Sequence, residues 1–172
     1  MILRAIDIWM RPIQKDDTFY ILKWRNNDGV KKNFINQEEL TAEIHEEWLK
    51  NKINTGKAIQ FIIFTIEENK PIGSIYLRDI DVDKNQAELG IFIGEENNRG
   101  KGIGGQAIEL IKKYAFDKLK LEKIYLRVLK DNTRAIACYK KNGFINQQEL
   151  EFEESSAQNI LFMSTTFSER KE

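Results

Sequence analysis

Residues 87–116 of the chain are AELGIFIGEENNRGKGIGGQAIELIKKYAF. The segment begins with a β-strand pattern, passes through a polar turn and a glycine-rich loop, and ends in an amphipathic helix pattern. This order places free backbone N–H groups at a helix N-terminus, where they can bind a phosphate. Glycines leave little side chain to obstruct a close anionic ligand. The segment therefore predicts a phosphate-binding loop, and the charges of Arg99 and Lys101 agree with that prediction.

Two known loop patterns fit these glycines, besides a plain glycine-rich turn before a helix. Gly102, Gly104 and Ala107 match the dinucleotide pattern G-x-G-x-x-A, which should follow its strand directly within a βαβ unit. Eight residues separate Ile93 from Gly102 here, and the upstream segments predict a hairpin, so a nicotinamide-dinucleotide site is disfavoured. The pattern Arg99-x-x-Gly102-x-Gly104 instead resembles the pyrophosphate loop of the GNAT superfamily, the acetyl-CoA-dependent N-acetyltransferases.

A second segment strengthens the resemblance. Residues 132–144, NTRAIACYKKNGF, resemble the other signature of this superfamily, N-x-x-A-I-x-x-Y-x-x-x-G-F, at the expected distance after the glycine loop. The similarity extends over nearly the whole chain. Residues 10–27, MRPIQKDDTFYILKWRNN, resemble the start of the branch that contains ribosomal-protein N-terminal, amino-sugar and antibiotic acetyltransferases.

The fold that the resemblance implies agrees with the hydrophobic patterns. It is a mixed α/β (α+β) fold with a mostly antiparallel sheet, splayed between its fourth and fifth strands, and helices on both faces. The patterns predict strands over 2–10, 59–66, 71–80, 87–93, 123–129, 144–152 and 160–167. They predict helices that begin at Asp16 or Asp17 and that span 38–50, 104–119 and 133–142.

Composition limits the function classes. The 172 residues suit a single domain over residues 1–172, and 27 basic and 27 acidic side chains give a formal net charge of zero. A neutral chain argues against nucleic acid or an anionic membrane as the main partner. The single Cys138 and the absence of a long apolar run predict a cytoplasmic protein without a membrane span. One histidine and one cysteine supply no metal-ligand spacing, and a monomer or a homodimer is expected.

The resemblance implies acetyl-CoA as co-substrate and no metal. In the family, the strand that corresponds to residues 91–93 pairs with the pantetheine arm, and a backbone N–H there polarises the thioester carbonyl. The following loop holds the pyrophosphate. Asn132 suits a helix cap, and the family's asparagine also contacts pantetheine. Gly90 and Gly94 suggest a β-bulge. The expected cofactor-binding residues are Ile91, Phe92, Ile93, Arg99, Gly100, Lys101, Gly102, Ile103, Gly104, Gly105 and Asn132.

Catalysis needs an acid for the departing thiolate. The matching motif places Tyr139 on the helix that faces the cofactor sulfur, and a phenol with a pKa of about 10 is protonated at pH 7. The alternative is a tyrosine that only packs in the core.

Catalysis also needs a neutral amine, although an alkyl ammonium has a pKa of about 10.4. Some relatives carry a glutamate as base on the strand before the tyrosine helix, but Arg127 occupies the matching position here. Glu88 is the next candidate base, and its alternative is a solvent-facing strand residue. His45 has a suitable pKa but lies in a charged run, which favours a surface or substrate-loop position over a base.

Acceptor choice should reside in the first helices. Arg25, Asn26 and His45 are the candidate substrate-binding residues, because a similar Arg-Asn pair and a His-x-x-Trp helix recur in acetyltransferases of nucleotide-linked amino sugars. A protein N-terminus, a polyamine and an aminoglycoside are the other acceptors considered. The predicted function is N-acetyl transfer from acetyl-CoA to a primary amine of a small molecule or peptide N-terminus, by direct attack in a ternary complex. The alternative is a catalytically silent acetyl-CoA-binding sensor or interaction module.

Overall fold

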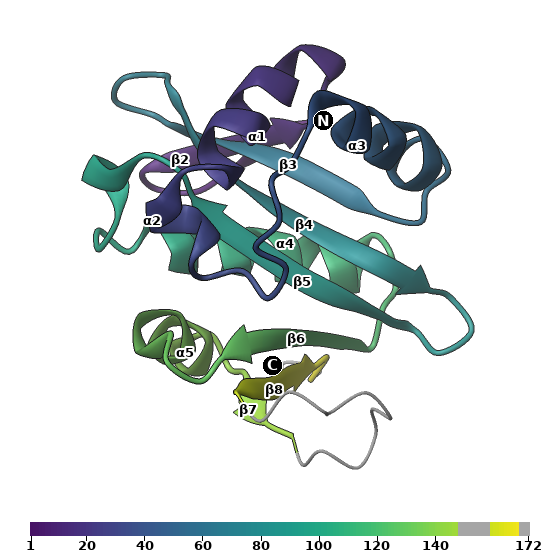
Figure 1. The fold of residues 1–172 in the computed structure, drawn as a ribbon. Coiled ribbons are helices and arrows are strands. Elements are labelled where there is room, and N and C mark those ends of the chain that lie inside the picture. The colour runs from purple at the N-terminus through teal and green to yellow at the C-terminus, as the bar shows by residue number, and fades with distance from the viewer. Residues whose placement is uncertain (148–158, 169–172) are drawn as a thin grey trace.

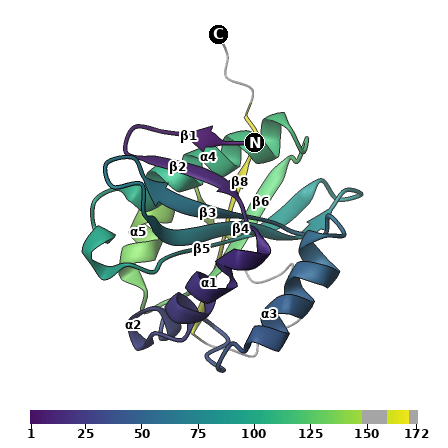
Figure 2. The same cartoon turned by 90° about the horizontal axis from the view of Figure 1, so that it is seen from above.

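The computed structural model describes residues 1–147 and 159–168. They form one eight-stranded sheet in the order β1-β2-β3-β4-β5-β6-β8-β7, with helices on both of its faces (Figures 1 and 2). The strands are β1 (Leu3–Arg4), β2 (Ile8–Pro12), β3 (Ile59–Thr65), β4 (Pro71–Asp81), β5 (Gln86–Ile93), β6 (Lys123–Leu129), β7 (Ile145–Asn146) and β8 (Ile160–Thr166). The α-helices are α1 (Thr18–Arg25), α2 (Asp28–Lys31), α3 (Ala42–Trp48), α4 (Ile103–Asp117) and α5 (Thr133–Lys141). The predicted mixed, mostly antiparallel fold is confirmed.

The pairing of β5 with its two neighbours determines where the site lies. On one side, β5 pairs antiparallel with β4 along most of its length, up to Ile93. On the other side, it runs parallel to β6 and pairs at only three positions, the last of which joins Glu88 to Tyr125. Beyond Glu88 the two strands part, as Figure 1 shows between β5 and the unit of β6 and α5. Because the first predicted strand is divided into β1 and β2, β5 and β6 are the strands predicted as the fourth and fifth.

Two hydrophobic clusters cover the two faces of the sheet. The larger cluster joins the sheet to α4, which buries Ala107, Ile108, Ile111 and Ala115 on one side. The smaller cluster joins the opposite face to α1 and α2 through Trp24, Val30 and Phe92. Alternate residues of a strand point to opposite faces. Glu88 and Phe92 therefore lie on the face of α1, while Ala87 and Leu89 belong to the cluster of α4.

The N-terminal strand prediction was wrong in one respect. Residues 2–10 form the hairpin of β1 and β2 rather than one strand. Ala5 N–H donates to the carbonyl of Ile8 at 2.9 Å and closes the turn. The side chain of Gln106 on α4 accepts from the N–H of Asp7 at 3.0 Å and donates to its carboxylate at 2.7 Å. This contact joins residues 99 positions apart, so no local pattern reveals it.

Helix limits differ from the predictions at the caps. The predicted helix 38–50 begins later, because the Thr41 side chain accepts from Ile44 N–H at 3.3 Å and caps α3. It continues as a π-helical turn over Leu49–Ile53. The short α2 was not predicted. Of the predicted strand 144–152, Ile145–Asn146 is strand and residues 148–152 lie outside the described residues.

Gly90 and Gly94, which were expected to form a β-bulge, are required for another reason. Register shifts in β4 and β5 occur between Arg78 and Asp81, away from both glycines. A Cβ at Gly90 would overlap the ring of Tyr76, and a Cβ at Gly94 would overlap the ring of Trp24. These glycines therefore give room for aromatic rings that pack on β5.

Candidate active site

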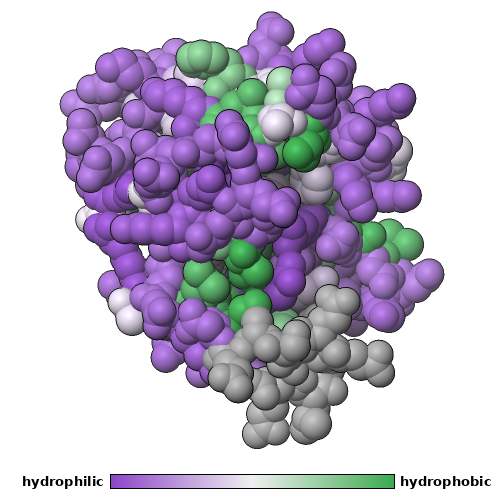
Figure 3. Space-filling view, in the orientation of Figure 1, coloured by the Kyte–Doolittle hydropathy of each residue, from purple (hydrophilic) through white to green (hydrophobic). Residues whose placement is uncertain are grey.

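A cavity of about 1110 Å³ opens where β5 and β6 part. Its walls come from β4, β5, the loop that leads into α4, the end of β6, α5 and the segment around α2. Figure 3 shows apolar surface in this region, surrounded by hydrophilic side chains. Leu89, Ile91, Ile103, Ile108 and Val128 are among the apolar residues that line it. A cavity of this size, lined by both apolar and charged residues, suits a small organic ligand.

The start of α4 forms one end of the cavity. Gly102 is the N-cap residue with φ +76°, and Gly100 has φ +74°, a left-handed conformation that side chains rarely adopt. The N–H groups of the first helical turn have no acceptor inside the helix, and the helix dipole is positive there. Gly100, Gly102, Ile103, Gly104 and Gly105 all line the cavity, whereas the exposed Lys101 does not. The predicted loop thus presents its backbone, with Lys101 turned elsewhere.

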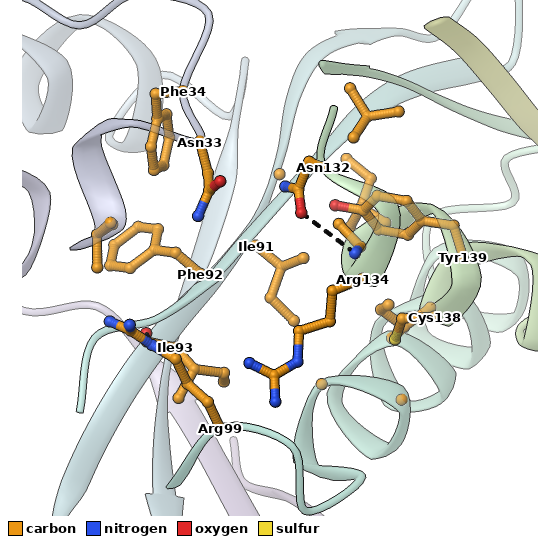
Figure 4. A pocket seen from close by; sticks show the side chains of 18 of the residues that line it. Asn33, Phe34, Ile91, Phe92, Ile93, Arg99, Asn132, Arg134, Cys138 and Tyr139 are labelled. Atoms are coloured by element: carbon orange, nitrogen blue, oxygen red, sulfur yellow. Dashed lines mark hydrogen bonds between the residues drawn. The ribbon is translucent and has the colours of Figure 1, made fainter. Parts of the chain in front are cut away.

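Two arginines hold and cover this loop. Arg99 Nε donates to the carbonyl of Ile93 at 3.0 Å, and its Nη2 lies 3.4 Å from the carbonyl of Gly94. Arg99 therefore fastens the loop to the end of β5. A Cβ at Gly100 would overlap the guanidinium of Arg134, so Arg134 of α5 lies directly over the loop. Figure 4 shows Arg134 pointing into the cavity between the Arg99 side and α5.

The edge of β5 lines the cavity along Leu89 to Ile93, where β6 no longer pairs with it. Ile91, Phe92 and Ile93 are all lining residues. Opposite them, Asn132 caps α5, since its side chain accepts from Ala135 N–H at 3.3 Å, the dashed line in Figure 4. The predicted cap is confirmed, and Asn132 also lines the cavity.

Tyr139 of α5 lines the cavity. Its ring is 8% exposed and packs against Phe144 with the ring centroids 5.8 Å apart. Its hydroxyl points toward Asn132 and the cavity in Figure 4. Burial raises the pKa of Tyr139. The phenol is therefore protonated at neutral pH and can donate a hydrogen bond.

Glu88 lies at the point where the strands part and is 5% exposed, unlike the solvent-facing alternative. Arg78 of β4 donates to its two oxygens from Nε at 3.1 Å and Nη2 at 3.0 Å. Arg127 of β6 donates from Nε at 2.9 Å. Burial alone would raise the pKa of Glu88, but the hydrogen bonds and charges of both arginines lower it below its ordinary value. A carboxylate stabilised in this way is a weaker base than a free one.

Of the three residues predicted to bind the acceptor, one lines the cavity and two contact other parts of the chain. Arg25 lines the cavity and stacks on Phe34, 3.5 Å from the ring centroid. Asn26 does not line it, because its amide pairs with both backbone groups of Leu40, at 2.9 and 2.8 Å, and fixes the segment before α3. His45 is 2% exposed rather than a surface residue, and its Nδ1 lies 2.9 Å from Thr18 Oγ1. Burial lowers the pKa of His45.

The structure adds lining residues that the sequence analysis did not single out, namely Tyr76, Arg78 and Arg134. Arg134 offered a local signal. It lies in the first turn of α5, where the positive helix end disfavours a cation unless an anion is near. Tyr76 and Arg78 offered none, because they join the site through the pairing of β4 with β5.

Two kinds of feature are absent from the described residues. No group of three or more His, Cys, Asp or Glu side chains there could hold a metal ion. None of the helices there has the length and apolar character needed to cross a bilayer.

Several known proteins are similar to this chain in sequence. Residues 7–145 match the acetyltransferase (GNAT) domain family. The spermidine N(1)-acetyltransferase of Escherichia coli K12 is 30% identical over 147 residues, which cover 85% of this chain and 77% of that protein. The acetyltransferase PseH of Campylobacter jejuni is 28% identical over 124 residues, 72% of this chain and 74% of that protein. The chain also matches a much longer Methanocaldococcus jannaschii protein, of which it spans 28%.

The solved structures show the same fold. Spermidine N-acetyltransferase from Vibrio cholerae, in complex with CoA and spermine, aligns with a TM-score of 0.81 and 24% identity over 93% of this chain and 95% of that one. The family match covers most of the chain, including β5, the glycine loop, α4 and α5. The chain therefore belongs to the GNAT family of acetyltransferases, enzymes that use acetyl-CoA as their acetyl donor.

Proposed function

We propose that this chain transfers the acetyl group of acetyl-CoA to a primary amine, in a ternary complex and without an acyl-enzyme. The observation that supports the proposal most strongly is the meeting of three features in one cavity. These are the unpaired edge of β5, the first turn of α4 and the hydroxyl side of Tyr139. The first accepts an extended chain, the second a pyrophosphate, and the third a departing thiolate.

The cofactor residues divide the work in this proposal. The backbone from Gly100 to Gly105 and the guanidinium of Arg134 bind the pyrophosphate, while Arg99 positions the loop. The edge of Ile91–Ile93 pairs with the pantetheine arm, and one N–H there polarises the thioester carbonyl as negative charge develops on its oxygen. Asn132 contacts the same arm from α5.

The chemical step needs no metal-bound or covalent enzyme intermediate in this proposal. The amine nitrogen attacks the thioester carbon, and the C–N bond forms as the carbonyl oxygen becomes negative. Collapse breaks the C–S bond, so the thiolate departs and takes the proton of the Tyr139 hydroxyl. The proton that the new amide nitrogen loses returns through water to Tyr139. The amine and the thioester are thus converted into an amide and a thiol, and no further reactant is needed.

The acceptor is a primary amine of a small molecule or of a peptide N-terminus. A nucleotide-linked amino sugar is the candidate we prefer, and a protein N-terminus is the second. Arg25 supports this choice because it alone of the three predicted acceptor residues lines the cavity. Spermidine, named in several relatives, carries only positive charge and fits the arginines of this cavity poorly.

Acetyl transfer is tested by thiol release from acetyl-CoA with a panel of amino-sugar nucleotides, N-terminal peptides, polyamines and aminoglycosides. The wild-type chain should release thiol with at least one amine. Gly102→Asp should lose acetyl-CoA affinity, because a side chain and a negative charge enter the pyrophosphate site at a left-handed position.

The control is Gly56→Asp, a left-handed glycine outside the cavity lining, which imposes similar backbone strain with no ligand nearby. It should keep its acetyl-CoA affinity by calorimetry. Equal affinities of Gly102→Asp and wild type would contradict the loop assignment, and tight cofactor binding with no turnover on any amine would support a binding module.

Tyr139→Phe should keep the fold and the acetyl-CoA affinity but slow acetyl transfer. The ring still packs on Phe144, while the one O–H donor aimed at the sulfur is lost. General acid catalysis contributes about 10²–10⁴-fold, and the low end is expected because a thiolate already leaves well. Single-turnover transfer is the measurement, since product release can conceal a slower chemical step in kcat. A wild-type single-turnover rate would reduce Tyr139 to a packing residue.

The general-base role of Glu88 stays a prediction, and its ion pairs argue against it. The lowered pKa keeps Glu88 ionised even within the pH range where a glutamate ordinarily titrates. Its protonation therefore cannot cause a change of rate near neutral pH. The rate should instead rise with pH as the acceptor amine loses its proton. Glu88→Gln should therefore keep this rise, measured as the pH profile of kcat/KM. A fall of about 10²-fold or more in kcat/KM at every pH in Glu88→Gln, with intact cofactor affinity, would contradict this prediction and support Glu88 as the base.

A further inference from the structure

We propose that the acceptor side of the cavity is a phosphate site, in which Arg25, Arg78 and Arg127 bind the phosphate or diphosphate of a phosphorylated amine. The proposal rests on the proposed acetyl transfer for the amine, but the phosphate site itself is carried by the side chains described below. In this proposal, the positive charges of the arginines select an acceptor that carries negative charge.

Three neighbouring strands bring the arginine pair together. Arg78 on β4 is opposite Glu88 on β5, and Arg127 lies on β6 two residues beyond Tyr125, the last partner of β5. All three side chains line the cavity. Arg78 uses Nε and Nη2 for Glu88, and Arg127 uses Nε. A guanidinium carries five N–H donors.

Donors therefore remain for a ligand. Among the described residues, no acceptor is hydrogen-bonded to Nη1 of Arg78 or to either Nη of Arg127. Both arginine side chains keep about a third of their surface exposed, 33% and 32%, while Glu88 beneath them keeps 7%. Glu88 thus fixes both guanidinium groups by direct hydrogen bonds, and both arginines line the cavity. Paired N–H donors of arginine match phosphate oxygens in geometry.

Arg25 supplies a third guanidinium. Phe34 stacks on it at 3.5 Å and limits its orientation, and its buried Nε has no hydrogen-bond partner. Burial lowers the pKa of Arg25, and the positive charge of Arg78 adds to this lowering, so the two cations act on each other. Arginine stays protonated nonetheless. An anion between these cations would favour their charged forms and could accept from the unused Nε of Arg25.

The charge balance of this side is far from that of the chain. Arg25, Lys32, Arg78 and Arg127 line it, and Glu88 is the one carboxylate among the described lining residues. The charge of Asp79 also acts on Arg78, but positive charge still exceeds negative charge on this side. The whole chain has a net charge of zero. A diphosphate on the acceptor would balance this excess more closely than a single carboxylate. A polyamine would be repelled.

The binding test uses the protein saturated with CoA, so that the pyrophosphate loop is occupied. Inorganic pyrophosphate and uridine diphosphate are titrated into this complex by calorimetry, and the diphosphate should bind. Arg127→Gln should weaken binding by about tenfold to a hundredfold, the loss expected for a charge-assisted hydrogen bond. Arg127→Lys should recover part of the affinity, and Arg4→Gln, an exposed cation on β1 outside this cavity, should bind as wild type does.

The acceptor test compares an amino sugar with its 6-phosphate and its uridine-diphosphate-linked form, with spermidine as the cationic reference. kcat/KM should rise with negative charge, and Arg127→Gln should reduce this preference while acetyl-CoA affinity is kept. Tighter binding of the nucleotide than of pyrophosphate would assign the source as a nucleotide, and equal binding would assign a simple phosphate ester.

Two outcomes overturn the proposal without touching acetyl transfer. One is a higher kcat/KM for spermidine than for the phosphorylated sugars. The other is the absence of diphosphate binding to the CoA complex, or equal binding to wild type and Arg127→Gln. No thiol release with any amine would instead overturn the proposed function, while the binding result would still decide the phosphate site.

Discussion

The site depends on the parting of β5 from β6 after three paired residues. A parallel strand that stayed paired to its end would close the sheet and leave no cavity. Here the last pair joins Glu88 to Tyr125, and Arg127 reaches back to Glu88 across the point of parting. Everything assigned to the cofactor lies beyond that point: the edge of β5, the glycine loop, the start of α4 and the face of α5. The glycine loop needs this opening, since a helix N-terminus binds a phosphate only where the ligand can approach.

The same point of parting lies between the proposed cofactor side and the proposed acceptor side of the cavity. Glu88 is buried between two arginines, and its charge costs little there because both partners donate directly to it. Without Glu88, the guanidinium groups of Arg78 and Arg127 would have no carboxylate between them. We therefore regard Glu88 as the residue that positions Arg78 and Arg127. Tyr139, across the cavity, stays neutral because its surroundings are apolar. One fold thus holds an ionised carboxylate and a protonated phenol in a single cavity.

The sequence predicted the parts that local pattern controls. The bounds of β6 agree with the prediction for 123–129, and α4 and α5 differ from theirs by at most two residues at each end. The glycine loop and Asn132 were found because a helix start has a strong local signature. The bend between β1 and β2 was missed, because a contact between Asp7 and Gln106 holds it. Likewise, Asn26 and His45 have suitable chemistry for an acceptor site, but packing directs them to Leu40 and Thr18. Arg127 was noted only as a missing glutamate, since its partner Glu88 comes from another strand.

Amide hydrogen exchange, measured with and without acetyl-CoA, tests the central claim that the opened edge of β5 is the cofactor site. Acetyl-CoA should slow exchange at the N–H groups between Leu89 and Ile93 that face the opening, and at the first turn of α4. Amides of β3, which is paired on both sides, should not change. Unchanged exchange along β5 and α4 at saturating acetyl-CoA, with protection elsewhere, would contradict the account.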